Sequence, residues 1–195
     1  MRIPLVNVPH PSIGSRIPDG HLPPLGLLSV GGALIDAGHE TRLLDADLAS
    51  LATEQIVEAT VAFAPEAVLF GHSGSTSAHS IIAEVSRRIR AACPEAWIVY
   101  GGVFPTYHWE EILRDERQID VIVRGEGERT APLLIHALEA GEPLCRIPGI
   151  AYRKNGKVLA TPDAALIENL DDYRVGWELI DPKRYRRFAL KHYRR

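Results

Sequence analysis

Cysteines are scarce in this chain, and long apolar runs are missing. The 195 residues contain two cysteines, Cys93 and Cys145, too few for a disulfide framework, a four-thiolate metal site or a three-thiolate iron–sulfur site. We expect each to be a small buried hydrophobe. No run approaches the ~20 apolar residues of a bilayer span, and the N-terminal MRIPLVNVPHPSIG has no apolar signal-peptide region. These absences predict a cytoplasmic protein with no membrane span.

Two common nucleotide-binding motifs are also absent. The chain has no Gly-Lys-Ser/Thr of a P-loop, and no G-x-G-x-x-G follows its first predicted strand. A phosphoacceptor receiver domain would end its third strand on an aspartate, where this chain has Gly71-His72. A flavodoxin-like FMN site stays open as an alternative, although the loop that would hold its phosphate is rich in proline.

Short apolar runs alternate with helical patterns over the first 140 residues. With 46% hydrophobic and 24% charged residues, the chain can build a real core. The pattern predicts an α/β fold: a flavodoxin-like, or Rossmann-like, five-stranded parallel sheet with helices on both faces. The strands are expected at 2–8, 41–45, 67–71, 96–102 and 119–123, and the helices at 24–37, 53–64, 78–92, 107–114 and 128–140.

A different pattern follows the alternating region. Residues 149–162, GIAYRKNGKVLATP, read as a β-hairpin with Asn155-Gly156 at its turn. We expect this hairpin to form a small addition at the sheet edge. The predicted organisation is therefore an α/β domain over 1–145, a hairpin over 146–165 and a less regular segment over 166–195.

The loops that follow the predicted strands are the places to look for a site, because ligands of open parallel sheets bind outside the carboxyl ends of the strands. A proline- and glycine-rich loop follows the first strand and is longer than usual for a βα connection. The later loops read GHSGSTSAHS, GGVFPT and RGEGERT. Their small and hydroxyl residues let a ligand approach the backbone and offer it hydrogen-bonding groups.

The segments PPLGLLSVGGALIDAGHETRLLDAD, GHSGSTSAHS, YGGVFPT and IDVIVRGEGE, in this order, resemble the cobalamin-binding domain at the front of B12-dependent radical S-adenosylmethionine (SAM) proteins. Within that group the chain is most similar to the anaerobic magnesium-protoporphyrin IX monomethyl ester cyclases. The hairpin and IENLDDYRVGWELIDPKRY are similar to that family's connection into the radical SAM domain. The resemblance therefore makes 166–195 a basic linker toward a radical SAM domain in cis.

The resemblance implies a corrinoid partner: cobalamin on the strand ends, with its nucleotide tail in the sheet crevice. The implied activity of the whole enzyme is oxidative cyclisation of a tetrapyrrole in bacteriochlorophyll synthesis, or radical methylation. No catalytic residue and no metal ligand is expected from this chain. The expected cofactor-binding residues are His10, Ser73, Gly74, Ser75, Thr76, Gly101, Gly102, Val103, Phe104, Thr106, Gly125, Glu126 and Gly127.

Three departures from the family pattern limit these expectations. The D-x-H-x-x-G motif that supplies a cobalt ligand in better-known B12 domains is missing, so we do not expect His10 to ligate cobalt. Phe104 stands where relatives frequently carry histidine. The C-x-x-x-C-x-x-C motif is also missing, so the [4Fe–4S] cluster and SAM are expected only in a downstream domain. Whether this chain acts as an enzyme by itself stays open.

The charge of the chain is unevenly distributed. Residues 183–195 carry seven Lys or Arg and no acid, whereas the other 182 residues carry 15 basic and 25 acidic side chains, so a net of −10 precedes a tail of +7. Such a tail is compatible with a nucleic-acid-binding or partner-binding α/β domain. We favour the linker, because a sequence-independent nucleic-acid binder spreads its positive charge over a folded face.

Overall fold

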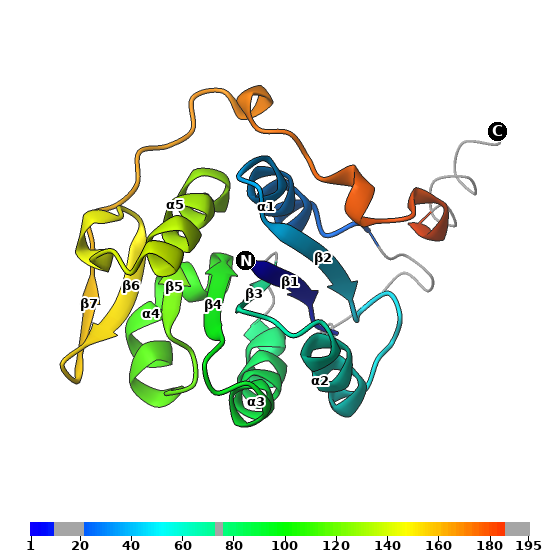
Figure 1. Ribbon diagram of the computed structural model, residues 1–195, viewed down its shortest axis with the longest axis horizontal. Helices are drawn as coiled ribbons and strands as arrows, with labels where there is room; N and C mark the ends of the chain where they lie inside the picture. Colours follow the sequence, from blue (N-terminus) through cyan, green and yellow to red (C-terminus); the bar gives the residue numbers. More distant parts are fainter. Residues whose placement is uncertain (10–21, 73–75, 186–195) are drawn as a thin grey trace.

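The computed structural model describes residues 1–9, 22–72 and 76–185. One mixed sheet runs through this part of the chain, in the strand order β2-β1-β3-β4-β5-β6-β7 (Figure 1). Strands β1 to β5 pair parallel with one another, whereas β6 pairs antiparallel with both β5 and β7. The strands are β1 (Arg2–Asn7), β2 (Glu40–Asp45), β3 (Ala67–His72), β4 (Trp97–Gly102), β5 (Val121–Val123), β6 (Ile150–Lys154) and β7 (Lys157–Ala160).

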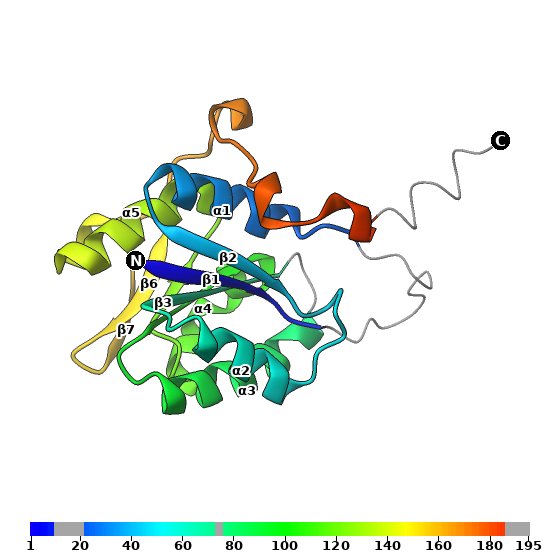
Figure 2. The same ribbon diagram turned by 45° about the vertical axis from the view of Figure 1, so that its right-hand side comes forward.

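Helices cover both faces of the sheet (Figures 1 and 2). One face carries α1 (Leu25–Asp36) and α5 (Gly127–Ala140), and the other carries α2 (Thr53–Ala62), α3 (Thr76–Ala92) and α4 (Val103–Asp115). The predicted flavodoxin-like fold is confirmed for the five parallel strands. The predicted hairpin is β6 and β7, which extend the same sheet to seven strands.

The core lies in two layers, because successive side chains of a strand point to opposite faces. Val68 and Phe70 of β3 pack toward α2, α3 and α4, whereas Leu69 packs toward α1 and α5. All three are almost fully buried. Strands that are buried on both sides read as continuous apolar runs, which is why the sequence pattern locates them.

Some details differ from the expectations. The fourth helix begins at Val103 rather than Tyr107, because Gly102 turns the chain directly from strand into helix. Cys93 is half-buried and Cys145 is exposed, so the prediction of two buried cysteines is wrong. Within the described part of the chain, no helix is long and apolar enough to cross a membrane.

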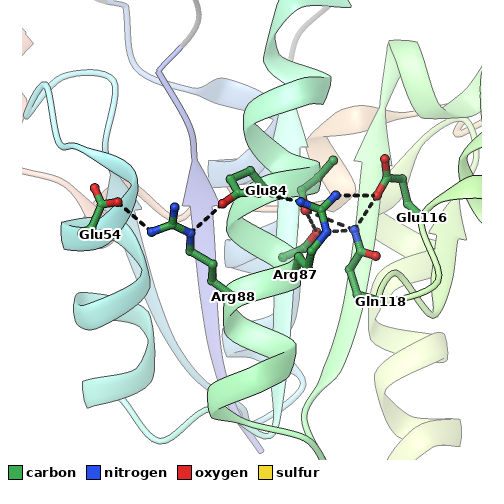
Figure 3. Close-up of polar contacts among 8 residues, drawn as sticks. Glu54, Glu84, Arg87, Arg88, Glu116 and Gln118 are labelled. Carbon is green, nitrogen blue, oxygen red and sulfur yellow. Dashed lines mark hydrogen bonds and ion pairs between the residues drawn. The ribbon is translucent and has the colours of Figure 1, made fainter.

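Ion pairs fasten α3 to its neighbours on the outer surface (Figure 3). Arg88 contacts Glu54 of α2 and Glu84 of its own helix, each at 2.6 Å. Arg87 contacts Glu84 at 2.5 Å and Glu116, beyond the end of α4, at 3.4 Å. These exposed pairs are individually weak, and together they fix the relative positions of three helices.

The amino edge of the sheet is closed by a denser polar network. Asp120 accepts from the guanidinium of Arg90 at 2.5 Å and from the N–H of Ile98 at 2.8 Å. Arg153 of β6 donates to the carbonyls of Leu113 and Ile119. The polar groups at this edge therefore form hydrogen bonds with one another.

Candidate functional site

The carboxyl edge of the sheet contains a topological switch point. Strand β1 pairs with β2 on one side and with β3 on the other, so the connections after β1 and β3 leave in opposite directions. A crevice opens between such loops, and ligands of open α/β sheets bind there. The structure therefore has a switch point at the carboxyl edge, where the sequence predicts the site.

Four of the predicted site residues, His10, Ser73, Gly74 and Ser75, lie outside the described residues. Thr76 is the first residue of α3, and only its backbone is described. These five assignments stay predictions. The other eight predicted residues lie in two segments at the carboxyl edge: Gly101, Gly102, Val103, Phe104 and Thr106 after β4, and Gly125, Glu126 and Gly127 after β5.

Gly101 and Gly102 end β4, beside Gly71 and His72 of β3. Gly102 has φ 110° and is the N-cap of α4, a conformation that costs a residue with a Cβ atom considerable free energy. A Cβ on Gly101 would approach Val123 no closer than 3.6 Å, an ordinary contact. The backbone conformation at residue 102 therefore favours glycine there, whereas the packing around Gly101 leaves room for a side chain.

Thr106 connects the two segments. Its hydroxyl donates to the carbonyl of Gly102 at 2.8 Å, and the same oxygen accepts from the N–H of Gly125 at 3.0 Å. The hydroxyl proton is thus used inside the protein. Toward a ligand, Thr106 offers at most a remaining acceptor position, and its main effect is to hold the turn at Gly102 against the loop after β5.

The predicted segment after β5 shapes the edge through its backbone. Gly125 has φ 74°, in the left-handed region that glycine adopts readily. A Cβ on Gly127 would lie 2.9 Å from Val30 Cγ2 of α1, so this glycine lets α5 pack closely on α1. The carboxylate of Glu126 accepts from the N–H of Ile167 at 2.6 Å, so it fastens the chain beyond the hairpin to the start of α5.

Phe104 belongs to an aromatic cluster between α3 and α4. Its ring stacks on His108 with centroids 4.4 Å apart and contacts His79 at 5.0 Å. His79 in turn lies parallel to the buried ring of Tyr100 at 6.1 Å. Burial lowers the pKa of His79, so this imidazole is neutral near pH 7. The Phe104 ring therefore packs against α3 within the protein, at the start of α4.

Exposed apolar side chains gather where helices begin at the carboxyl edge. Val103, the first residue of α4, is 55% exposed, and Tyr107, one turn later, is 78% exposed. Leu25 begins α1, and Leu22 precedes it across two prolines; both are exposed. Sequence reasoning missed Leu22, Leu25 and Tyr107. The available signal was an apolar residue at a helix start, outside the helical spacing of the core positions.

Backbone donors complete this surface. The N-caps of α1, α4 and α5 are Pro24, Gly102 and Glu126, and none makes a side-chain cap hydrogen bond within the described residues. The first N–H groups of a helix have no partner inside the helix. An apolar surface bordered by such donors suits a large flat ligand with a carbonyl-rich rim. Nowhere in the described ranges do three His, Cys, Asp or Glu side chains gather in a metal-binding arrangement.

A family model described as the B12 binding domain matches residues 17–135. The chain belongs to the B12-binding domain family. This confirms the resemblance stated from the loops, and it favours cobalamin over the FMN alternative. The match spans the segment from the first loop into α5, which includes the described carboxyl ends of β2, β3, β4 and β5.

Individual relatives of this B12-binding domain extend the comparison. It is 55% identical over 185 residues to an anaerobic magnesium-protoporphyrin IX monomethyl ester cyclase from Synechocystis sp., covering 95% of this chain and 37% of the cyclase. It is 31% identical over 187 residues to an uncharacterised methyltransferase from Pyrococcus horikoshii, covering 95% and 40%. The chain thus spans well under half the length of these curated relatives.

A solved structure supports the fold. The radical SAM methyltransferase TsrM from Kitasatospora setae, with cobalamin and a [4Fe–4S] cluster bound, superposes with a TM-score of 0.69 at 20% identity. The alignment covers 89% of this chain and 31% of TsrM. At this identity the likeness establishes the architecture of the B12-binding domain.

Proposed function

We propose that cobalamin lies across the carboxyl edge of the sheet, over the start of α4. The observation that carries this placement is the exposure of Val103 at the first position of a helix whose N-cap is a glycine in a left-handed conformation. An apolar side chain there gains by covering the face of a macrocycle, since burying apolar surface contributes about 25 cal/mol per Å². Leu25 at the start of α1 and Tyr107 one turn into α4 are further exposed apolar side chains that could contact the cofactor.

The residues at this edge fit the chemistry of the cofactor's rim. Corrin side chains end in amides, whose carbonyls accept hydrogen bonds and whose N–H groups donate them. The unpaired first N–H groups of α1 and α4 can donate to those carbonyls. The hydroxyls of Ser73, Ser75 and Thr76, predicted from the sequence, would add further partners. The bound cofactor would supply cobalt–carbon chemistry, and the residues of this edge would hold and orient it.

The proposed parent activity is the oxidative cyclisation of a tetrapyrrole by a radical SAM enzyme. It is supported by the 55% identity to the Synechocystis cyclase. The 195 residues contain no C-x-x-x-C-x-x-C motif, so a [4Fe–4S] cluster and SAM would be held by a radical SAM domain in cis outside them. A cytoplasmic location is part of this proposal, and the use of only two cysteines is consistent with a reducing compartment.

Radical methylation is the second candidate. It is favoured by the 31% identity to the Pyrococcus horikoshii methyltransferase. The two reactions differ in carbon count, because methylation adds one carbon to the substrate, whereas cyclisation leaves the number unchanged. Mass spectrometry of the product, formed by the enzyme that contains this domain, therefore distinguishes them.

Cofactor binding is tested on the purified chain by absorption titration with hydroxocobalamin. We expect saturable one-to-one binding with a shift of the corrinoid bands. A chain that leaves the cobalamin spectrum unchanged and does not retain the cofactor through gel filtration would overturn the proposal. Titration with FMN is the matched comparison, and it is expected to show no binding.

A further inference from the structure

Residues 163–185, named the strap here, run back across the molecule after the hairpin. They leave the β7 edge, cross the side of the sheet that carries α5 and α1, and end beside β2 (Figures 1 and 2). Two contacts fix the start of the strap: Arg124 pairs with Asp163 at 3.0 Å, and Glu126 accepts from the N–H of Ile167. A linker without a fixed course would make no such contacts.

The middle of the strap is packed against a pair of glycines in α1. A Cβ on Gly32 would lie 2.1 Å from the carbonyl oxygen of Arg174, so the two backbones are in direct contact. The N–H of Gly176 donates to the carbonyl of Leu28 at 2.9 Å. Glycine inside a helix is unfavourable by about 1 kcal/mol relative to alanine, and close docking of the strap explains why α1 contains it.

Ion pairing and apolar packing reinforce this docking. Arg174 contacts Asp36, the last residue of α1, at 2.6 Å. Leu179 packs against the core layer beneath α1, and its Cδ1 lies 2.4 Å from where a Cβ on Gly31 would stand. The strap is therefore part of the folded domain rather than a free linker.

The end of the strap reaches the carboxyl edge of the sheet. The hydroxyl of Tyr185 donates to Asp45 Oδ2 at 2.5 Å, and Asp45 Oδ1 accepts from the side-chain amide of Asn7 at 2.8 Å. Asn7 and Asp45 are the paired last residues of β1 and β2. Burial and the neighbouring Asp45 raise the pKa of Tyr185, so this hydroxyl keeps its proton and remains a donor.

We propose that the hydrogen-bond chain Tyr185–Asp45–Asn7 is a latch that couples docking of the strap to occupancy of the cofactor edge. The proposal rests on the proposed placement of cobalamin. Asn7 is the last residue of β1, the strand at the switch point, and Asp45 accepts a hydrogen bond from its side-chain amide. Tyr185 acts through Asp45 and Asn7, so it is a positioning residue.

Coupling of this kind is reciprocal. If strap docking favours cobalamin binding, then bound cobalamin stabilises strap docking by the same factor. The latch thus predicts an effect in both directions: weaker cobalamin binding when Tyr185 cannot donate, and slower opening of the strap when cobalamin is bound.

The test uses the full chain and the variant Tyr185→Phe, which keeps the ring and removes the donor. Tyr173→Phe is the matched control, because the Tyr173 hydroxyl makes no hydrogen bond within the described residues. The dissociation constant for hydroxocobalamin is measured by absorption titration. Hydrogen exchange of the amides over 167–180 is measured with and without cobalamin.

We expect Tyr185→Phe to weaken cobalamin binding at least about fivefold, the lower end of typical coupling between sites, and Tyr173→Phe to leave it unchanged. Cobalamin should slow exchange of the strap amides in the unsubstituted chain and have less effect in Tyr185→Phe. Equal dissociation constants and equal hydrogen-exchange protection in the unsubstituted chain and in Tyr185→Phe would overturn the latch and leave the proposed function intact. If the unsubstituted chain binds no cobalamin, both the proposed function and the latch fail. The two failures are therefore distinguishable.

Discussion

The hydroxyl oxygen of Thr106 accepts a hydrogen bond from the N–H of Gly125 at 3.0 Å while its proton is donated to the carbonyl of Gly102 at 2.8 Å. One side chain thus fastens the turn after β4 to the loop after β5. The carboxyl edge over which we place cobalamin is therefore preformed by contacts within the protein.

Replacing Thr106 with valine keeps the shape of the side chain and removes both hydrogen bonds. We expect the free energy of unfolding to fall by about 1–2 kcal/mol, since each hydrogen bond contributes about 1 kcal/mol net. Denaturant unfolding measures the change. Thr106→Ser retains the hydroxyl and is expected to stay close to the original chain; equal losses in the two variants would contradict the assignment.

Replacing Gly32 with alanine places a methyl group against the Arg174 carbonyl. The backbone of the strap has to move away, and we expect a loss of about 1–3 kcal/mol, typical of overpacking. Trypsin should then cut after Arg174 faster than in the original chain. Gly26→Ala is the control in the same helix, because a Cβ there meets nothing within 4 Å. Similar cleavage rates in Gly32→Ala and the original chain would show that the strap is not held at this point.

Replacing Val103 with glutamate puts a charge on the proposed cobalamin surface. We expect the dissociation constant for hydroxocobalamin to rise at least about tenfold, equivalent to 1.4 kcal/mol, with little change in stability because the side chain is exposed. Leu133→Glu on α5 is the matched control, since Leu133 is 45% exposed and lies away from the edge. Equal weakening in both variants would argue against this surface.

Stability is expected to fall on mild acidification. Burial is the largest cause that lowers the pKa of both His79 and His39 below the ordinary value of 6.5. As the pH falls through 6.5, the unfolded chain takes up these protons before the folded chain does, so folding loses free energy.

Urea unfolding at about pH 7.5 and about pH 5.5 measures this loss. His79→Gln and His39→Gln are each expected to reduce the difference between the two pH values, whatever their effect on stability at neutral pH. The reductions should add in the double variant, because His79 lies on α3 and His39 in the turn between α1 and β2, and no contact joins them within the described part of the chain. If the stability difference between the two pH values is as large in His79→Gln as in the original chain, His79 does not contribute to the loss of stability on acidification.

The five βα units could be predicted because their strands are buried on both faces and read as apolar runs. Continuous apolar runs such as AVLF at 67–70 leave little choice in which residues form the element and in whether it is a strand or a helix. Trp97 shows the limit of this reasoning: the apolar run AWIVY indicates a buried strand, yet the Trp97 side chain is 36% exposed. It is the first residue of β4, whereas Ile98, Val99 and Tyr100, which follow it, are buried.

The sequence predicts the edge at which we propose the site, but not the contacts made there. Strand order alone puts the loops after β4 and β5 at one edge. The internal roles of Thr106 and Glu126 depend on Gly125 and Ile167, which the fold brings near from distant positions. The course of the strap was hidden for the same reason, since it has no periodic pattern and is held by tertiary contacts to Gly32, Asp36 and Asp45.

The strap also has a consequence for the order of folding. Its contacts join residues far apart in the chain: Arg174 to Asp36 across 138 positions and Tyr185 to Asp45 across 140. Closing such long loops has an entropic cost that only an already formed α1 and β2 can offset. The strap should therefore dock last during folding and open first under native conditions, which would expose Gly31 and Gly32 of α1 while the sheet is still intact.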